Sequence, residues 1–256
     1  MNAVHPAHDP GTNAGAVDIV PALVTLHVWG VPLRQVPAAA AAMVTDRRAL
    51  NRSPNLTFVK LLGTGGTRTF TPRDADPRHW AVLACWSDPR AVDVFEHSAF
   101  VRSWDRRADA GHGGERLRVL MRPLASRGRW SGREPFGTPP AQSYAGPVAA
   151  VTRARLRPSR AVTFWRAVPP VSARLATAPG LRLALGIGEA PVGVQGTFSL
   201  WDDADALQAF AYGTAEHADA VRRTPQVGWY REELFARLAV LATSGSFGGV
   251  ALAPVT

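Results

Sequence analysis

Short apolar runs recur along the chain in an order that appears twice. In the first half, runs typical of β-strands occupy residues 22–29, 56–62, 80–86 and 117–121. In the second half, the corresponding runs occupy residues 148–156, 181–187, 195–201 and 235–241. Helical patterns at residues 36–50 and 161–177 separate the first two strands of each half. A second, amphipathic helix is expected after the third strand, where Asp88 or Asp203 suits the N-cap position.

The two halves also resemble each other residue by residue. At a shift of 115 positions, Trp86 aligns with Trp201 and Phe95 aligns with Phe210. Further upstream the shift is 125, which places a ten-residue insertion in the first half, within residues 63–79. That stretch is rich in Gly, Thr, Asp and Pro, as is typical of a loop. Internal similarity of this kind predicts a duplicated architecture.

The order of elements predicts the fold class. Strand, helix, strand, strand, helix, strand is the ferredoxin-like βαββαβ unit, whose sheet has helices on one face only. The other face must also be covered, and two copies can cover each other. We therefore predict an α+β fold in which two tandem ferredoxin-like βαββαβ repeats pack as an intramolecular pseudo-dimeric α+β barrel. The expected organisation is a disordered tail at 1–18, a first repeat at 19–128, a linker at 129–146 and a second repeat at 147–256.

Composition narrows the functional class. Hydrophobic residues make up 46% of the 256 residues, enough for a substantial core. The single cysteine, Cys85, excludes a disulfide framework and a cysteine-based zinc site, and it suits a small buried hydrophobic position. Residues 1–18 lack the basic start and apolar centre of a signal peptide, and the long uncharged run at 238–256 is rich in Gly, Ser and Thr. A cytoplasmic protein is expected.

Arginine dominates the positive charge. The formal net charge is +9, Lys60 is the only lysine, and such a bias is typical of a GC-rich genome. Between Arg116 and Arg182 there are thirteen arginines and one acidic residue, Glu134. This stretch suits a solvated surface, anionic lipid headgroups at the inner membrane surface, or the carboxylates of a ligand. Because no nucleic-acid-binding module accompanies the charge, no nucleic-acid partner is expected.

Histidine offers the candidate metal ligand. His217 lies seven residues after Phe210, so it shares a helical face with Ala206 and Gly213 if the helix continues. The aligned residue in the first half is Arg102, so the halves differ there. A histidine on an apolar stripe is either a hydrogen-bonded core residue or a metal ligand, and neutral imidazole binds haem iron well.

Acid–base candidates are few. Glu189 follows a predicted strand, and Glu232 and Glu233 follow Trp229 and Tyr230; capping or surface roles would explain all three. No pair of carboxylates has the arrangement of a general acid and base. Phosphate-loop, dinucleotide-binding and serine-hydrolase motifs are also absent. A cofactor is therefore expected to supply the reactivity.

Four blocks are distinctive enough to compare with known families. They are Gly128-Arg-Trp-Ser-Gly132 with Pro135-Phe136, Phe164-Trp-Arg-Ala-Val-Pro169, Gly186-Ile-Gly-Glu-Ala-Pro191 running into Gln195-Gly-Thr-Phe-Ser-Leu-Trp201, and Trp229-Tyr-Arg-Glu-Glu-Leu-Phe-Ala-Arg237. In these blocks the chain resembles the spheroidene monooxygenase family, also called acyclic carotenoid 2-ketolases. With weaker matches between the blocks, the resemblance runs from about residue 21 to residue 249.

The resemblance implies a haem-containing, oxygen-dependent enzyme of the dimeric α+β barrel superfamily. It implies oxygen insertion at C-2 of an acyclic carotenoid, giving a hydroxy and then a keto product, with a separate ferredoxin as electron donor. On chemical grounds we expect His217 as the axial iron ligand, with Arg222 and Arg223 pairing with haem propionates. The further candidates are Glu189, Gln195 and Tyr230 as catalytic residues and Trp229 as a cofactor contact.

Two other functions remain open on the sequence alone. One is a haem-binding or haem-degrading protein of the same fold, which would consume haem during turnover. The other is a cofactor-free α+β barrel that binds a ligand, which would show no haem absorption band.

Overall fold

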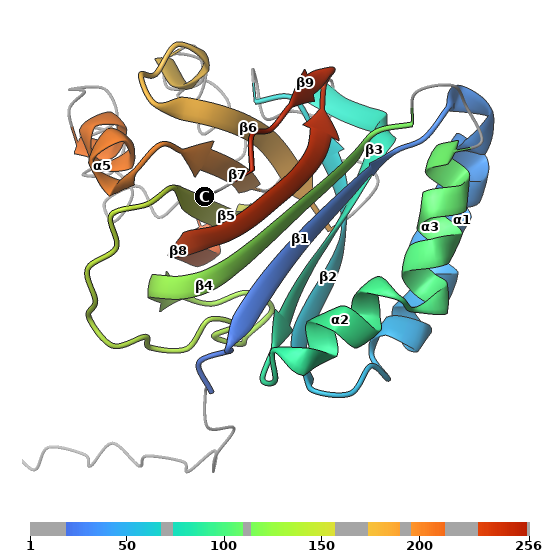
Figure 1. Cartoon of the computed structure of the whole chain (residues 1–256), viewed down its shortest axis with the longest axis horizontal. Coiled ribbons are helices and arrows are strands. Elements are labelled where there is room, and N and C mark those ends of the chain that lie inside the picture. The colour runs from blue at the N-terminus through green and yellow to red at the C-terminus, as the bar shows by residue number, and fades with distance from the viewer. Residues whose placement is uncertain are drawn as a thin grey trace, which may run out of the picture.

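The computed structural model describes residues 19–67, 74–109, 114–156, 174–189, 196–212 and 230–254 (Figure 1). The predicted tail at 1–18 lies outside these residues, as does most of the predicted helix at 161–177. No helix in the described ranges combines the length and apolar character needed to cross a bilayer.

The first half follows the predicted order. Its elements are β1 (Leu23–Gly30), η1 (Leu33–Gln35), α1 (Val36–Leu50), β2 (Leu56–Gly65), β3 (Ala75–Trp86), α2 (Arg90–Glu96), α3 (Ala99–Asp109) and β4 (Arg116–Gly128). The helix predicted at 36–50 is confirmed with the same bounds. The helix predicted after Asp88 is two helices, because Ser98 accepts the Val101 N–H through its side chain at 3.2 Å and starts a new helix. The inserted stretch is partly strand, because it extends β2 and β3.

The second half has the same order in its described residues. Its elements are β5 (Val148–Leu156), β6 (Leu181–Gly188), β7 (Gly196–Trp201), α5 (Ala204–Tyr212), β8 (Tyr230–Phe247) and β9 (Val250–Ala251). The bounds of β5 agree with the prediction. The predicted N-cap is confirmed at α5, where the Asp203 carboxylate accepts the Ala206 N–H at 2.8 Å. Strand β8 is far longer than the predicted run because it pairs with both β4 and β5.

The strands form one closed antiparallel sheet. Their order is β4-β1-β3-β2-β6-β7-β5-β8, and a further pairing of β8 with β4 closes the ring of eight strands. The two halves meet along β2 with β6 and along β4 with β8. The fold is therefore an α+β barrel with helices on its outside (Figure 1).

The strands of the two halves pair in the same register. Trp86 ends β3 and pairs with the first residues of β1 and β2, and Trp201 ends β7 and pairs with the first residues of β5 and β6. A register shift follows immediately in both β2 and β6. Each tryptophan contacts the aligned phenylalanine of the next helix, with ring centroids 5.0 Å apart for Phe95 and 5.2 Å apart for Phe210.

The inside of the sheet holds a hydrophobic core shared by both halves. Alternate residues of β1 point inwards, and strands of both halves contribute buried Val, Leu, Ile and Phe side chains to the same cluster. Trp130 and Phe136, from the predicted linker, are 1% and 0% exposed and belong to this cluster. The segment that joins the halves is therefore part of the core.

The outer face of the first half is packed with aromatic rings. Trp29, Trp80, Trp86 and Trp104 are each at most 4% exposed between the sheet and helices α1, α2 and α3. Trp104 lies 5.5 Å from Trp29 and 6.5 Å from Trp80, measured between ring centroids. Burying rings of this size is a large part of the stability of this layer.

The outer face of the second half holds a smaller buried cluster. Its buried members in the described residues are Leu124, Val148, Leu175, Trp201 and Ala239, and α5 packs against them through partly exposed side chains. In the described residues, the first outer face is thus filled by large buried side chains, and the second carries fewer of them.

A charged cluster fixes the tip of the C-terminal hairpin. His79 lies between two carboxylates, with Nδ1 2.6 Å from Asp76 and Nε2 2.8 Å from Glu115. Glu115 also accepts the N–H groups of Gly248 and Gly249. Burial favours neutral imidazole, but the hydrogen bonds to Asp76 and Glu115 outweigh it and raise the pKa of His79. Burial acts against ionisation of both carboxyls too, but the His79 contacts and backbone N–H groups lower the pKa values of Asp76 and Glu115.

Replacing His79 should therefore destabilise the protein in a pH-dependent way. The raised pKa of His79 stabilises the fold fully below its unfolded value of about 6.5, and this contribution is lost as the pH rises through the folded value. We expect His79→Gln to lower the free energy of unfolding by about 1 to 2 kcal/mol at pH 6 and by less at pH 9. Urea unfolding at both pH values measures this difference. The exposed His97→Gln is the control and should have little effect at either pH; an equal loss for both variants would contradict the role of His79.

Candidate functional site

A network of charged and polar side chains closes one end of the barrel interior. We call it the barrel-end network; its members are Lys60 of β2, Trp130 and Ser131 of the joining segment, Arg153 of β5, Glu189 at the end of β6 and Glu232 of β8. Lys60 and Arg153 are buried, with side chains 10% and 5% exposed. The network therefore links both halves and the segment between them.

Glu189 is the centre of this network. One carboxylate oxygen is 2.6 Å from the Lys60 ammonium, and the other accepts the Trp130 indole N–H at 2.7 Å and an Arg153 N–H at 2.9 Å. The Lys60 ammonium also donates to the Ser131 hydroxyl at 2.6 Å. Both oxygens of Glu189 thus have charged or strongly polar donors, which holds the side chain in one position.

Glu232 anchors the joining segment. It accepts the N–H groups of Ser131 at 2.9 Å and Gly132 at 2.6 Å, and it forms an ion pair with Arg153. Ser131 and Gly132 have φ angles of 55° and 74°, so this turn is in the left-handed region that favours glycine. Successive N–H groups in such a turn converge and bind an anion. The turn conformation explains why Gly132 follows Ser131 in the sequence.

Both carboxyl groups of the network remain ionised at neutral pH. Burial acts against ionisation of Glu189, but hydrogen bonds from Lys60 and Trp130 and the charges of Lys60 and Arg153 lower its pKa. Burial likewise acts against ionisation of Glu232, and the N–H groups of Gly132 and Ser131 together with Arg153 lower its pKa. Two cations then balance two carboxylates. Neither glutamate has a proton to donate at neutral pH, so the network orients and holds rather than protonates.

The other predicted site residues are not all brought together. Glu189 lies in the barrel-end network, and Tyr230 begins β8, where its backbone pairs with β5. Gln195, His217, Arg222, Arg223 and Trp229 lie outside the described residues, and their roles stay predictions. Among the residues that the structure describes, no group of three or more His, Cys, Asp or Glu side chains is placed to hold a metal ion.

The sequence analysis missed Lys60 and Arg153. The available signal was that Lys60 is the only lysine of the chain and stands in the apolar strand Leu-Thr-Phe-Val-Lys-Leu-Leu. A charge in such a strand needs a buried partner. The partner of Lys60 is distant in the sequence, since Glu189 is 129 residues away from it.

A hollow of about 440 Å³ lies beside the start of α5. It lies between α5 and the segment that precedes β6, and its lining includes Arg174, Ala178, Gly180, Ala206 and Phe210. Its volume is in the range of small-molecule pockets. The second half therefore has open space next to its helix.

Removing the charge of Glu189 should destabilise the barrel. Glu189→Gln would leave Lys60 and Arg153 with less counter-charge in a buried place, and we expect the free energy of unfolding at pH 7 to fall by about 3 kcal/mol. The control is Glu134→Gln, which removes the exposed pair with Arg129 and should cost less than about 1 kcal/mol. Urea unfolding of both variants measures the difference, and similar losses would show that the network is not a stabilising centre.

Comparison with known proteins gives the family. The chain is 37% identical over 219 residues to the spheroidene monooxygenase of Rhodobacter capsulatus, covering 84% of this chain and 88% of the relative. It is 34% identical over 248 residues to that of Rubrivivax gelatinosus, covering 94% and 88%. The corresponding protein of Cereibacter sphaeroides is 32% identical over 210 residues, covering 81% of this chain and 63% of the relative. No family model matches the chain.

Solved structures agree on the fold. A crystal structure of aldoxime dehydratase has a TM-score of 0.56 at 14% sequence identity, covering 85% of this chain and 80% of that chain. An aldoxime dehydratase in complex with butyraldoxime has a TM-score of 0.54 at 14% identity, covering 85% and 79%. Similarity at this level of identity shows the fold alone. The sequence relatives, in contrast, are more than 30% identical over most of both chains, and they show that the chain belongs to the spheroidene monooxygenase family and is an oxidoreductase of the monooxygenase type.

Proposed function

We propose that this protein is a haem-dependent monooxygenase that inserts oxygen at C-2 of an acyclic carotenoid, forming first an alcohol and then a ketone. The observation that carries the substrate class is the identity of 37% to a spheroidene monooxygenase over most of both chains. Each inserted oxygen atom requires one dioxygen, two electrons and two protons, and the second oxygen atom of the dioxygen leaves as water. A second insertion at C-2 gives a geminal diol, which loses water to form the ketone. An activated iron centre is suited to attack on an unactivated carbon.

The electrons come from a separate protein in this proposal. The chain contains one cysteine, and Cys85 is completely buried, whereas an iron–sulfur cluster takes several cysteine ligands. A ferredoxin is the proposed donor. A peripheral contact with an anionic membrane surface, where carotenoids dissolve, is proposed for the arginine-rich middle of the chain.

We also propose that the halves are tandem ferredoxin-like repeats whose outer faces have diverged. Alignment on Trp86 and Trp201, supported by the shared register, pairs large outward residues of the first half with smaller ones of the second. The pairs are Thr25 with Ala150, Trp29 with Ala154, Val59 with Ala184 and Leu61 with Gly186. The second-half face therefore lacks the side chains that fill the first.

This second outer face fits a flat, apolar cofactor such as haem. If Gly186 and Ala154 were replaced by residues as large as the aligned Leu61 and Trp29, the new side chains would occupy the surface on which a planar ring would lie. Bound haem would supply the iron that activates dioxygen. In the proposal, α5 packs on Trp201 through Phe210 and leads towards His217, which supplies the axial imidazole. Arg222 and Arg223 follow in sequence as proposed partners of the propionates.

The carotenoid would bind at the same outer face. The barrel interior is filled by its shared core, by Trp130 and Phe136, and by the barrel-end network. A polyene has no room there, because cores of this kind are close-packed. Glu189 comes six residues before Gln195 in the sequence, and Glu232 comes shortly after Trp229 and Tyr230, so the network would hold the chain next to these residues in position from inside.

Absorption spectroscopy tests the cofactor directly. We expect the protein, titrated with haemin, to develop a stoichiometric Soret band, and we expect His217→Ala to lose or shift it while the far-ultraviolet circular dichroism is unchanged. No Soret band at any haemin concentration would overturn the haem proposal and favour a cofactor-free barrel. An unchanged spectrum in His217→Ala would exclude His217 as the axial ligand. Loss of the haem itself during turnover would favour haem degradation over carotenoid oxidation.

A large side chain added to the second outer face tests whether the cofactor binds there. Ala150→Phe places a large side chain at the centre of this face, and we expect it to abolish the haemin Soret band. The matched control is Ala41→Phe on the exposed side of α1, which should bind haemin as the unmodified protein does. Equal haemin binding by both variants would contradict placement of the cofactor on this face.

A further inference from the structure

Arg237 of β8 lies on the second outer face and forms no ion pair with any of the residues that the structure describes. Its neighbours β4 and β5 present Ala125 and Ala150 opposite it, and Phe235 and Ala239 flank it along its own strand. The Nε atom is buried and has no hydrogen-bond partner, and in the described part of the chain the guanidinium forms no ion pair. The carboxylate on the same side of β8, Glu233, is four residues away, about 13 Å along an extended strand.

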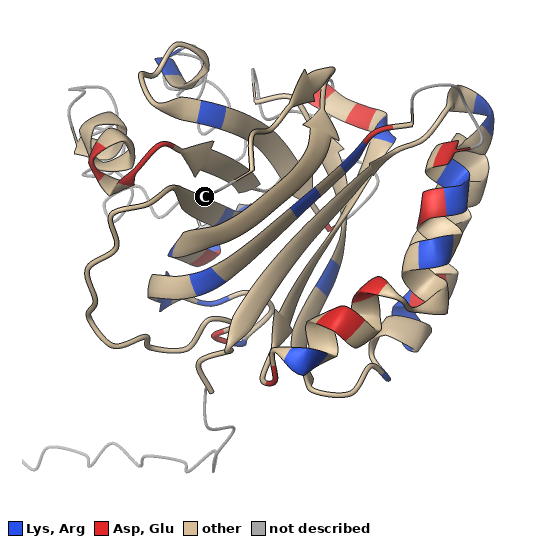
Figure 2. Ribbon diagram, viewed as in Figure 1, with Lys and Arg blue, Asp and Glu red and all other residues tan. Residues whose placement is uncertain are grey.

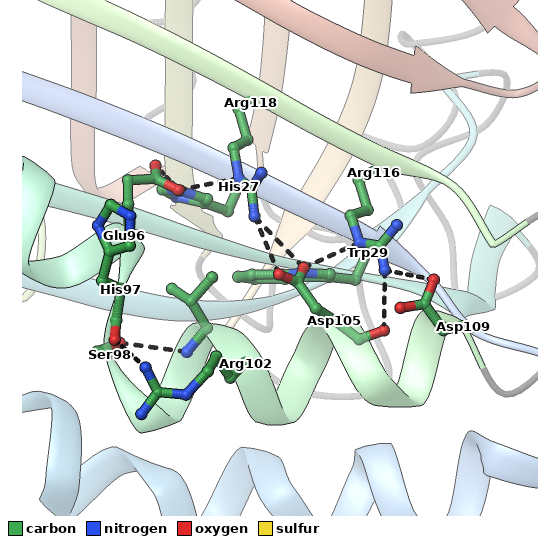
Figure 3. Close-up of polar contacts among 11 residues, drawn as sticks. His27, Trp29, Glu96, His97, Ser98, Arg102, Asp105, Asp109, Arg116 and Arg118 are labelled. Atoms are coloured by element: carbon green, nitrogen blue, oxygen red, sulfur yellow. Dashed lines mark hydrogen bonds and ion pairs between the residues drawn. The ribbon is translucent and has the colours of Figure 1, made fainter.

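The first half shows how such a cation is normally satisfied. Arg118 of β4 lies on the first outer face and forms ion pairs with two carboxylates, with Nε 3.1 Å from Glu96 and an Nη atom 3.2 Å from Asp105 (Figure 3). Its Nε, like that of Arg237, makes no hydrogen bond, so the two arginines differ in their ion pairs. Those carboxylates also accept from His27 at 2.6 Å and from the Trp29 indole at 2.8 Å. Helices α2 and α3 thus supply two acids to the sheet beneath them.

The aligned positions of the second half do not carry these acids. At the shift of 115, Glu96 aligns with Ala211 and Asp105 aligns with Ala220. Figure 2 shows charges of both signs along α2 and α3, whereas α5 has acidic residues near its start only. In the strand register, Arg237 takes the place of Leu120, an apolar residue that packs against the first-half helices. Among the described residues, the second outer face therefore has a cation at Arg237 and no carboxylate paired with it.

A half-buried cation without an ion pair destabilises the fold, so its presence calls for an anionic partner. We propose that Arg237 binds a carboxylate of the cofactor on this face, so that the second half uses a ligand where the first half uses Glu96 and Asp105. This inference rests on the proposed function, and it assigns a propionate of haem as the chemical group that Arg237 recognises. A guanidinium and a carboxylate form charge-assisted hydrogen bonds with matched geometry.

Haemin and its dimethyl ester, in which both propionates are esterified, provide the test. We expect the unmodified protein to bind haemin about tenfold to a hundredfold more tightly than the ester, as charge-assisted hydrogen bonds imply. Arg237→Met should weaken haemin binding by about tenfold, leave binding of the ester unchanged and so reduce the preference, because Arg222 and Arg223 are proposed to pair with the propionates as well. Arg237→Lys keeps the positive charge and should therefore lose less of the preference for haemin than Arg237→Met does. Absorption titration measures each affinity.

The matched control is Arg118→Met, which removes the corresponding cation of the first outer face. In the haem-free proteins, we expect Arg118→Met to lower the free energy of unfolding and Arg237→Met to leave it unchanged or raise it, because only Arg118 has protein counter-charges. Arg118→Met should keep the preference for haemin over the ester.

Three results would overturn the assignment. They are an Arg237→Met variant that keeps the full preference for haemin, one that weakens haemin and ester equally, and one that destabilises the haem-free protein as much as Arg118→Met does. If the unmodified protein binds neither porphyrin, the proposed function itself fails, and that result is distinct from each of the three.

Discussion

Closure of the sheet is the constraint on which the rest of this structure depends. Because β4 pairs with β8 and β2 pairs with β6, every strand has one face turned into a common interior and one face turned outwards. The interior must be filled by both halves together, and the open end must be sealed without leaving buried charges unpaired. Trp130 and Phe136 fill space there, and Lys60, Arg153, Glu189 and Glu232 neutralise one another.

Closure also leaves two outer faces that are free to differ. Neither outer face contributes to the interior, so substitutions on one face leave the shared core intact. The first face is filled by tryptophans and by helices whose acids neutralise Arg118. The second has small residues and Arg237 instead. In the proposed function, the first half serves stability and the second serves chemistry, which fits the general finding that residues at ligand sites often reduce stability.

The local sequence pattern was sufficient to predict most helices and strands, but it was insufficient to predict the barrel-end network. The strand at 148–156, the helix at 36–50 and the Asp203 cap follow from periodicity and capping chemistry, which depend on neighbouring residues. The similarity of Trp86 and Trp201 also predicted the shared order. The barrel-end network depends on pairing between distant strands: Lys60 meets Glu189 only because β2 joins β6, and no local rule specifies that register. The extra helix break at Ser98 likewise depends on a single side-chain hydrogen bond.

The position of Lys60 has a consequence for chemical modification of this protein. It carries the only lysine ε-amino group of the chain, and its nitrogen is held by Ser131 and Glu189 inside the barrel end. A reagent that acylates lysine can therefore react with this ε-amino group only when its contacts with Ser131 and Glu189 break. The rate of acylation at that single position therefore measures how often this end of the barrel opens locally.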